Sequence, residues 1–324
     1  MSESRYALVG DVGGTNARFA LADTVSGALE SIESLPCSEF SGLEGVIANY
    51  LARVGERRVA RACLAVAGIV SESPVQMTNN PWSFVVDDIK HRFGWQEFRV
   101  INDFSAMALG ALQVREDHQQ HVCGGPGDQH APRLVLGPGT GLGMAGLVPS
   151  GDDWIVLPSE GGHVAFAPAD EEEFAVQGVL RKRHSRVSVE RILSGPGLVN
   201  LYQALGVVQG REAPLDSPAT ILQTAQRNQD LLAVDTLNRF CHILGRVAGD
   251  AVLTMGSTGG VYLCGGILPR MLDFLLASPF RAGFESKGRM SALVASTPVT
   301  VITDPYTGLR GAAASLSGMT VGHP

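Results

Sequence analysis

Short apolar runs alternate with glycine-rich turns along this chain. The runs at 6–9 and 17–22 flank the turn Gly10-Asp11-Val12-Gly13-Gly14-Thr15-Asn16. A second pair of runs, at 134–136 and 144–148, flanks a similar turn at 137–143 that contains Thr140. Two apolar runs joined by a tight glycine turn predict a β-hairpin. Two such hairpins, one opening each half of the chain, predict a duplicated α/β fold of two related domains.

Other patterns predict the remaining elements. Strands are expected at 62–67, 99–101, 164–167 and 261–264, and helices at 42–54, 104–112, 170–184 and 230–255. The segment 304–315 predicts a turn that leads into a helix of small residues. The polar stretch 115–133 predicts a surface loop near a domain boundary. The uncharged stretch 251–269 approaches membrane-spanning length, but its five glycines favour a helix end, a turn and a buried strand.

Composition narrows the class of protein. The 324 residues suffice for two domains, and 45% hydrophobic with 18% charged residues is typical of a globular chain. A net charge of −7 disfavours nucleic acid and anionic membranes, so we expect neither as a partner. The five cysteines are scattered without a C-x-x-C pair, and no signal peptide is recognisable, which predicts reduced thiols and a cytoplasmic location.

The glycine hairpins are the candidate phosphate sites. The chain has no Walker-type P-loop. Its one G-x-G-x-x-G, at Gly141, Gly143 and Gly146, lies between two predicted strands, whereas a dinucleotide fingerprint needs a helix after it. Amides of a tight turn can donate to phosphate oxygens, with Thr15 and Thr140 as further donors. Asp11 could hold a hydrated Mg²⁺, although purely structural hairpins remain an alternative.

Polar residues after predicted strands are the candidate substrate ligands. Asn102-Asp103 follows a strand at the edge where open α/β sheets bind ligands, and it also suits a helix N-cap, for which aspartate is favourable. Glu160-Gly-Gly-His163 supplies directional donors and acceptors that suit sugar hydroxyls. Glu190 is equally explained as an acid in the first turn of a helix.

Several motifs together resemble one family. The segments D-V-G-G-T-N-A-R at 11–18, L-V-L-G-P-G-T-G-L-G at 134–143 and V-Y-L-C-G-G-I at 261–267 resemble the phosphate and adenosine motifs of the hexokinase and actin ATPase superfamily. The segments at 100–104, 160–163, 188–197 and 280–288 follow in the order found in bacterial glucokinases of the proteobacterial type. The chain resembles that family from residue 5 to about 315.

The resemblance implies a fold and an activity. The fold is α/β, with two related ribonuclease-H-like domains of the actin and hexokinase type and a cleft between them. A small domain would comprise 1–109 with the tail 303–324, and a large domain 110–302. The activity would be ATP-dependent phosphorylation of D-glucose at its 6-hydroxyl, giving glucose 6-phosphate and ADP, the first step of glycolysis. The enzyme would act as a homodimer with ATP and Mg²⁺.

The resemblance also assigns roles to residues. Asp103 would be the catalytic base that accepts the proton of the attacking hydroxyl. Sugar contacts would come from five residues, namely Asn102, Asp103, Glu160, His163 and Glu190. The nucleotide would be bound by Asp11, Gly13, Gly14, Thr15, Asn16, Gly139, Thr140, Gly141, Gly265 and Gly266. Asp11 would hold Mg²⁺ through water.

Rival interpretations remain open. A related group of sugar kinases and repressors adds a zinc-binding cysteine cluster to E-G-G-H, and we expect no zinc because this chain lacks that cluster. A sugar-sensing regulator would carry a DNA-binding segment, and only five residues precede Tyr6. An ATPase of the actin or chaperone kind would not need Asn102-Asp103 together with Glu160-Gly-Gly-His163. A kinase for another hexose fits the same residues.

Overall fold

The chain forms two compact units. The computed structural model describes residues 4–55, 57–78, 80–318 and 320–322. Unit 1 comprises Met1–Glu116, Leu147–Pro158 and Asp304–Pro324, and unit 2 comprises Asp117–Gly146 and Ser159–Thr303. These bounds separate the chain into its two most compact parts. They assign residues 147–158 to the first unit, whereas the sequence predicts that these residues belong to the large domain. The expected domain boundaries at 109 and 302 stay a prediction.

A five-stranded sheet forms the centre of unit 1. Its order is β3-β2-β1-β4-β8, with β1 antiparallel to β2 and parallel to β4. The strands are β1 Tyr6–Val12, β2 Asn16–Asp23, β3 Leu29–Pro36, β4 Val59–Val66 and β8 Glu97–Asn102. A small sheet follows β4, made of β5 Gly68–Ile69, β6 Val75–Met77 and β7 Ser83–Phe84. The predicted first hairpin and the strands near 62–67 and 99–101 are confirmed.

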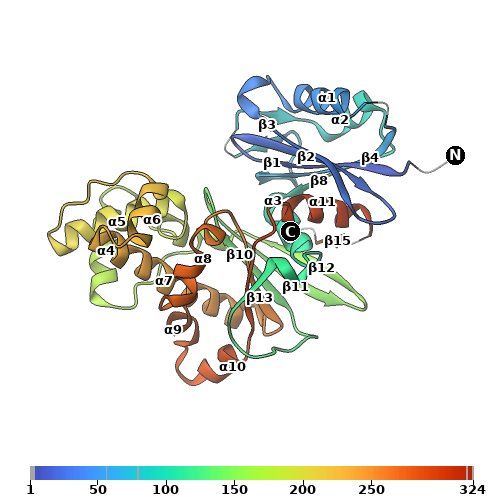
Figure 1. Ribbon diagram of the computed structural model, residues 1–324. Coiled ribbons are helices and arrows are strands. Elements are labelled where there is room, and N and C mark those ends of the chain that lie inside the picture. Colours follow the sequence, from blue (N-terminus) through green and yellow to red (C-terminus); the bar gives the residue numbers. More distant parts are fainter. Residues whose placement is uncertain (1–3, 56, 79, 319, 323–324) are drawn as a thin grey trace. The chain divides into compact units, whose positions relative to one another are not determined.

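Helices cover both faces of this sheet (Figure 1). On one face, α1 Leu43–Val54 and α2 Val86–Phe93 bury a core of large side chains that includes Phe19, Tyr50 and Trp95. On the other face lie α3 Asp103–Ala111 and α11 Thr307–Leu316, over small residues such as Ala65. Segments about 200 residues apart in sequence therefore share one face of one sheet.

The helices α3 and α11 are packed unusually closely. A methyl group on Gly311 would lie 1.7 Å from the carbonyl oxygen of Ala106, and one on Gly110 would lie 1.9 Å from that of Thr307. Real side-chain contacts are longer than 3 Å, so each of these positions accepts only glycine at the present separation. The small residues predicted at 304–315 thus bring two helix backbones into direct contact.

Unit 2 contains most of the helices. Its strands are β9 Gln119–Cys123, β10 Arg133–Pro138, β13 Gly260–Leu263 and β14 Val299–Ile302, together with the first part of β11 Leu142–Ser150, whose residues from 147 onward belong to unit 1. Its α-helices are α4 Glu171–Arg181, α5 Gly195–Gln209, α6 Pro218–Gln226, α7 Leu231–Met255, α8 Leu272–Ala277, α9 Phe280–Glu285 and α10 Ser291–Ala295. The long α7 packs against α5, α6 and α9, and its apolar face supplies much of the core (Figure 1). Among the described residues, no helix is long and apolar enough to span a membrane.

The two sheets repeat one strand order. The second sheet runs β15-β12-β11-β10-β13-β14-β9, with β12 Asp153–Ser159 and β15 Thr320–Val321. Its stretch β12-β11-β10-β13-β14 matches β3-β2-β1-β4-β8 of the first sheet. The strands β10, β13 and β14 are parallel to one another, as are the corresponding strands β1, β4 and β8 of the first sheet. The predicted duplication is therefore confirmed at the level of topology.

The structure corrects three local predictions. Residues 164–167 form no strand and make only an isolated bridge between Ala165 and Ser188, because no neighbouring strand pairs along them. The stretch 115–133 is not all loop, since it contains the edge strand β9. The helix cap at 102–103 is Asn102, whose Oδ1 accepts from Phe104 N–H at 2.9 Å, while Asp103 is the first helical residue.

Candidate functional site

The first glycine hairpin joins β1 to β2. Gly13 N–H donates to the carbonyl of Asn16 at 3.0 Å, and the carbonyl of Thr15 accepts from Cys37 N–H at 2.8 Å. These bonds hold the turn closed while the side chains of Thr15 and Asn16 stay exposed. The turn thus offers backbone amides and a hydroxyl at the end of a buried strand.

Asp11 lies on β1 just before this turn. Its register partner on β2 is Arg18, and the Cα of Gly308 faces its carboxylate so closely that a methyl group there would lie 3.1 Å from Oδ2. Burial raises the pKa of the Asp11 carboxyl above its ordinary value, and Arg18 opposes the rise. A cation bound beside this carboxylate would favour its ionised form.

Asn102 and Asp103 lie at the junction of β8 and α3. The side chain of Asn102 accepts from Phe104 N–H and from Ser105 N–H, at 2.9 and 3.2 Å. Its amide donates to the carbonyl of Gly68 at 3.4 Å. Oδ1 of Asp103 accepts from Phe104 N–H at 2.9 Å. The cap therefore fixes the backbone on which Asp103 sits, at the carboxyl end of a parallel strand.

The second glycine hairpin joins β10 to β11 in unit 2. Gly139 N–H donates to the carbonyl of Gly141 at 2.7 Å, and Gly195 N–H donates to the carbonyl of Gly139 at 2.8 Å. The side chain of Thr140 is exposed, and nothing lies within 4 Å of the side-chain position of Gly139. Within the described part of the chain, the amides of Thr140 and Gly141 meet no acceptor. This turn can therefore receive phosphate oxygens.

Gly265 and Gly266 follow β13, and Gly265 lies against the strand that enters this hairpin. Gly265 has a φ of +93°, and a methyl group on it would lie 2.6 Å from the carbonyl oxygen of Pro138. Cys264 N–H donates to the carbonyl of Leu136 at 2.8 Å. The space at Gly266 is open. Glycine at 265 thus lets the end of β13 approach the strand that enters the hairpin.

Glu160, His163 and Glu190 form one cluster in unit 2. His163 lies in the 3₁₀-helix η3 Gly161–His163, and Glu190 lies in η4 Val189–Arg191. His163 Nε2 is 3.9 Å from Glu160 Oε2, and His163 Nδ1 is 4.0 Å from Glu190 Oε1. The side chains of Glu160 and His163 are 75% and 57% exposed, so they can contact a ligand from solvent. Such a set can accept and donate to several hydroxyls of one sugar ring.

The structure places the predicted residues in two sets. Unit 1 holds Asp11, Gly13, Gly14, Thr15, Asn16, Asn102 and Asp103. Unit 2 holds Gly139, Thr140, Gly141, Glu160, His163, Glu190, Gly265 and Gly266. Within unit 2, Glu190 is brought onto the second hairpin, since its Oε2 accepts from Leu142 N–H at 2.9 Å. The sequence alone gave no sign of this contact, because the two residues are 48 positions apart.

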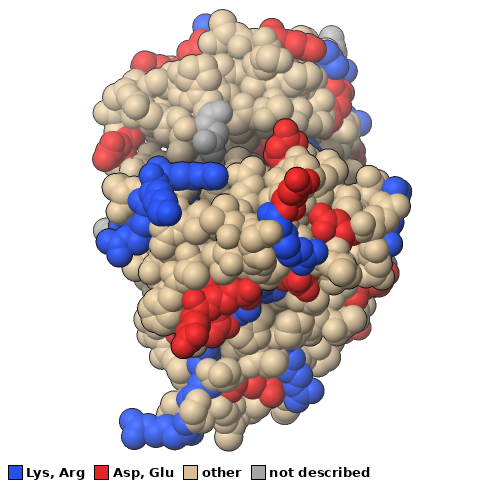
Figure 2. Space-filling model, turned by 90° about the vertical axis from the view of Figure 1, so that its left-hand side faces the viewer, with Lys and Arg blue, Asp and Glu red and all other residues tan. Residues whose placement is uncertain are grey.

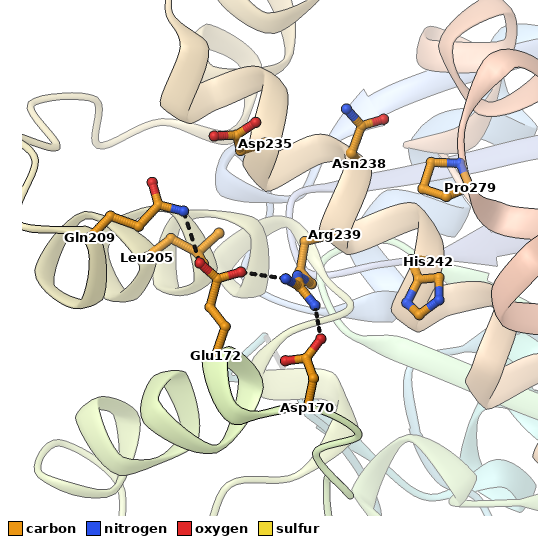
Figure 3. A pocket seen from close by; sticks show the side chains of 9 residues that line it. All are labelled: Asp170, Glu172, Leu205, Gln209, Asp235, Asn238, Arg239, His242 and Pro279. Carbon is orange, nitrogen blue, oxygen red and sulfur yellow. Dashed lines mark hydrogen bonds and ion pairs between the residues drawn. The ribbon is translucent and has the colours of Figure 1, made fainter.

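A cavity lies elsewhere in unit 2. About 550 Å³ in volume, it lies among α4, α5 and α7, and none of the predicted site residues lines it (Figure 3). Arg239 is ion-paired there with both Asp170 and Glu172, and Gln209 donates to Glu172 at 3.0 Å (Figure 3). Burial lowers the pKa of the neighbouring His242, and the positive charge of Arg246 lowers it further. The polar groups of this cavity thus hold three helices together.

Metal-binding groups and surface charge are further signs by which a site can be recognised. Across 4–55, 57–78, 80–318 and 320–322, no three His, Cys, Asp or Glu side chains form a group that could hold a metal ion. On the face shown in Figure 2, basic and acidic residues form small separate groups divided by uncharged surface. All five cysteines are buried free thiols, as their spacing predicted.

The chain is similar to known sugar kinases along almost its whole length. Residues 8–319 match the family model described as Glucokinase. A glucokinase of Marinobacter nauticus is 54% identical over 321 residues, which cover 99% of this chain and 100% of that protein. The crystal structure of a glucokinase from an Antarctic psychrotroph has a TM-score of 0.87 at 39% identity, covering 96% of this chain and 98% of that one.

A more distant structure shares the fold alone. It is a ROK-family glucokinase from Streptomyces griseus in complex with glucose and AMPPNP, with a TM-score of 0.61 at 20% identity, covering 95% of this chain and 98% of that one. The duplicated sheets with their glycine hairpins and these neighbours define a sugar kinase of the actin-like ATPase fold. More particularly, the chain belongs to the glucokinase family.

Proposed function

We propose that this protein transfers the γ-phosphoryl group of ATP to the 6-hydroxyl of D-glucose. The observation that carries the proposal is the glucokinase match over residues 8–319, together with a cluster of sugar-type ligands beside an open glycine hairpin. The Streptomyces griseus relative with glucose and AMPPNP bound supports the same pair of substrates.

In the proposed reaction, Asp103 is the general base. The 6-oxygen of glucose forms a bond to the γ-phosphorus, the bond from that phosphorus to the β–γ bridging oxygen breaks, and ADP leaves. The hydroxyl proton passes to the carboxylate of Asp103. Asn102 supports this role by capping α3, because the cap fixes the backbone of its neighbour.

Sugar recognition is assigned to Asn102, Asp103, Glu160, His163 and Glu190. The exposed Glu160 and His163 present one acceptor and one donor-acceptor group, and the more enclosed Glu190 presents another carboxylate. Glucose offers a ring of equatorial hydroxyls, for which several directional partners are needed. A turnover assay with a panel of hexoses therefore distinguishes a glucose kinase from a kinase for another sugar.

Nucleotide binding is assigned to the two glycine hairpins and to Gly265-Gly266. Amides of the turns at 13–16 and 139–141 would donate to the phosphates, and the open space at Gly266 leaves room for the nucleoside. Asp11 would hold Mg²⁺ through water, and the raised pKa of its carboxyl fits a neighbouring cation. When bound, Mg²⁺ supplies charge screening for the phosphates.

Two further assignments belong to the proposal. A homodimer follows from the family resemblance, and the exposed Phe174 and Val207 supply apolar surface for such an interface. Light scattering on the purified protein tests it, since a particle with the mass of one chain would contradict it. A cytoplasmic location is supported by the five free thiols, and fractionation of the producing cells tests it.

The experiment is a turnover assay with Mg-ATP and a panel of hexoses, following ADP and sugar 6-phosphate together. We expect ADP and sugar 6-phosphate to form in equal amounts, and only when glucose is present. Asp103→Asn keeps an oxygen for Phe104 N–H but cannot accept the proton, so kcat should fall at least ~10²-fold with glucose binding retained. Near-normal kcat in that variant would refute the base, and ADP release indifferent to sugars would refute the kinase.

A further inference from the structure

Glu190 touches the second glycine hairpin directly. Its Oε2 accepts from the N–H of Leu142, the residue that begins β11 where the hairpin ends, at 2.9 Å. A methyl group on Gly141 would lie 2.5 Å from the same oxygen. The carboxylate therefore lies against the backbone of the turn, in a position that any side chain at 141 would block.

A second connection closes a ring around this contact. Gly195 N–H, at the start of α5, donates to the carbonyl of Gly139 at 2.8 Å. Ser194, which caps α5, donates its hydroxyl to the carbonyl of Glu190 at 2.8 Å. The segment 190–195 thus holds the hairpin at both ends, and the side chain of Glu190 is one of its two attachments.

The other oxygen of Glu190 faces the sugar ligands. Oε1 is 4.0 Å from Nδ1 of His163, whose Nε2 is 3.9 Å from Glu160 Oε2. A carboxylate has about four lone-pair positions, so Glu190 can accept from Leu142 N–H and from a sugar hydroxyl at once. Among the described residues, Glu160 has no such double position, because its side chain is 75% exposed and its contact is with His163.

We propose that Glu190 couples the two substrates, as a positioning residue for the phosphate hairpin as well as a sugar ligand. This coupling rests on the proposed function. Glucose binding orders the carboxylate of Glu190 and, through Leu142 N–H, the turn at 139–141. ATP then binds a turn that is already ordered, at a smaller entropic cost. By linkage, bound nucleotide tightens glucose binding by the same factor.

Calorimetry of the full-length protein measures this coupling. The Kd of glucose is determined with and without a saturating non-hydrolysable ATP analogue, and the reverse titration is run as a check on reciprocity. Wild-type protein should show tightening of about fivefold or more, the lower end of ordinary allosteric coupling. In Glu190→Gln the factor should fall toward one, because the amide has no charge and a single acceptor oxygen, for which Leu142 N–H and a donating sugar hydroxyl compete.

Two matched variants separate coupling from simple loss of binding. Glu160→Gln should weaken glucose binding yet keep the coupling factor, since Glu160 does not reach the hairpin. Gly141→Ala keeps the Glu190 carboxylate chemically intact but pushes its Oε2 away from Leu142 N–H, so it should reduce the coupling factor and weaken nucleotide binding. Melting temperatures of all variants identify any that fail to fold.

The outcomes are distinct from those of the turnover assay. A wild-type enzyme that phosphorylates glucose without any coupling would overturn the inference and leave the proposed function intact. Unchanged coupling in both Glu190→Gln and Gly141→Ala would also overturn it. Absence of glucose-dependent turnover in wild-type protein would instead refute the proposed function.

Discussion

Replacing Gly311 by alanine should force α3 and α11 apart. The new methyl group would lie 1.7 Å from the carbonyl oxygen of Ala106, whereas ordinary contacts of this kind begin at 3.4 Å. Both partners are helix backbone, so neither can rotate away as a side chain can. The helices must separate by more than an ångström, or α3 must tilt.

The expected cost follows from two opposing effects. Overpacking a close-packed core typically costs about 1–3 kcal/mol, and a clash with backbone belongs at the upper end of that range. Alanine is a better helix former than glycine by about 1 kcal/mol, which offsets part of the cost. The free energy of unfolding should therefore fall by about 2 kcal/mol, a Tm loss of about 4–8 °C for a domain of this size.

The same displacement should affect catalysis, because α3 begins at Asp103. A misplacement of about 1 Å can cost ~10²-fold in rate, so kcat should drop by about 10- to 100-fold if Asp103 is the base. Thermal unfolding and steady-state kinetics, both at a temperature where the variant is folded, measure the two effects. The matched control is Gly178→Ala in α4, where nothing lies within 4 Å and the protein should be slightly stabilised.

A Gly311→Ala variant as stable as wild type would refute the packing argument. Lost stability with unchanged kcat would retain that argument but remove the link between helix position and Asp103.

Three further predictions concern stability and reactivity. Arg239→Ala should cost about 1–3 kcal/mol in unfolding free energy, because Asp170, Glu172 and Glu173 each lose an ion-pair partner. Arg239→Lys should recover part of this cost, and unchanged urea midpoints would contradict the prediction. Backbone amides of Ser26 and Val25 together with Arg5 hold the pKa of Asp23 well below its usual range, so its stabilisation is present above about pH 4 and is lost as pH falls further. The Tm difference between wild type and Asp23→Asn should accordingly shrink from pH 7 to pH 3, and a constant difference would refute the assignment. Burial raises the pKa of Cys63, Cys241 and Cys264 to about 12, so thiol reagents at pH 8 should label the native protein at least ~10²-fold more slowly than the protein in urea.

The hairpins and the main helices were predictable because their signals are local. A glycine turn between two apolar runs determines a hairpin without reference to the rest of the chain, and both hairpins form as expected. The strand predicted at 164–167 was wrong because a run of apolar residues forms a strand only where another strand pairs along it. The strand β9 was missed because its polar residues suit the exposed edge of a sheet, where patterning is weak.

The sequence predicted which residues belong to the candidate site, but it did not predict the contacts that they make. Asn and Asp are both good helix caps, so the sequence could not decide between Asn102 and Asp103, and the end of β8 places Asn102 at the cap. Glu190 was chosen by resemblance, and only the folded chain brings its carboxylate to Leu142 N–H. Contacts between distant segments depend on the packing of whole elements, which composition and spacing do not describe.

The position of α11 in unit 1 has a consequence for biosynthesis. The small-residue face of β1, β2, β4 and β8 is covered by α3 and α11, yet α11 is translated only after the whole of unit 2. At about 5–20 residues per second, the ribosome needs roughly 10–40 s for residues 117–303. During that interval the nascent first unit exposes one apolar face of its sheet. Unit 2 is therefore expected to complete its fold first, and the emerging first unit is a natural client for chaperones.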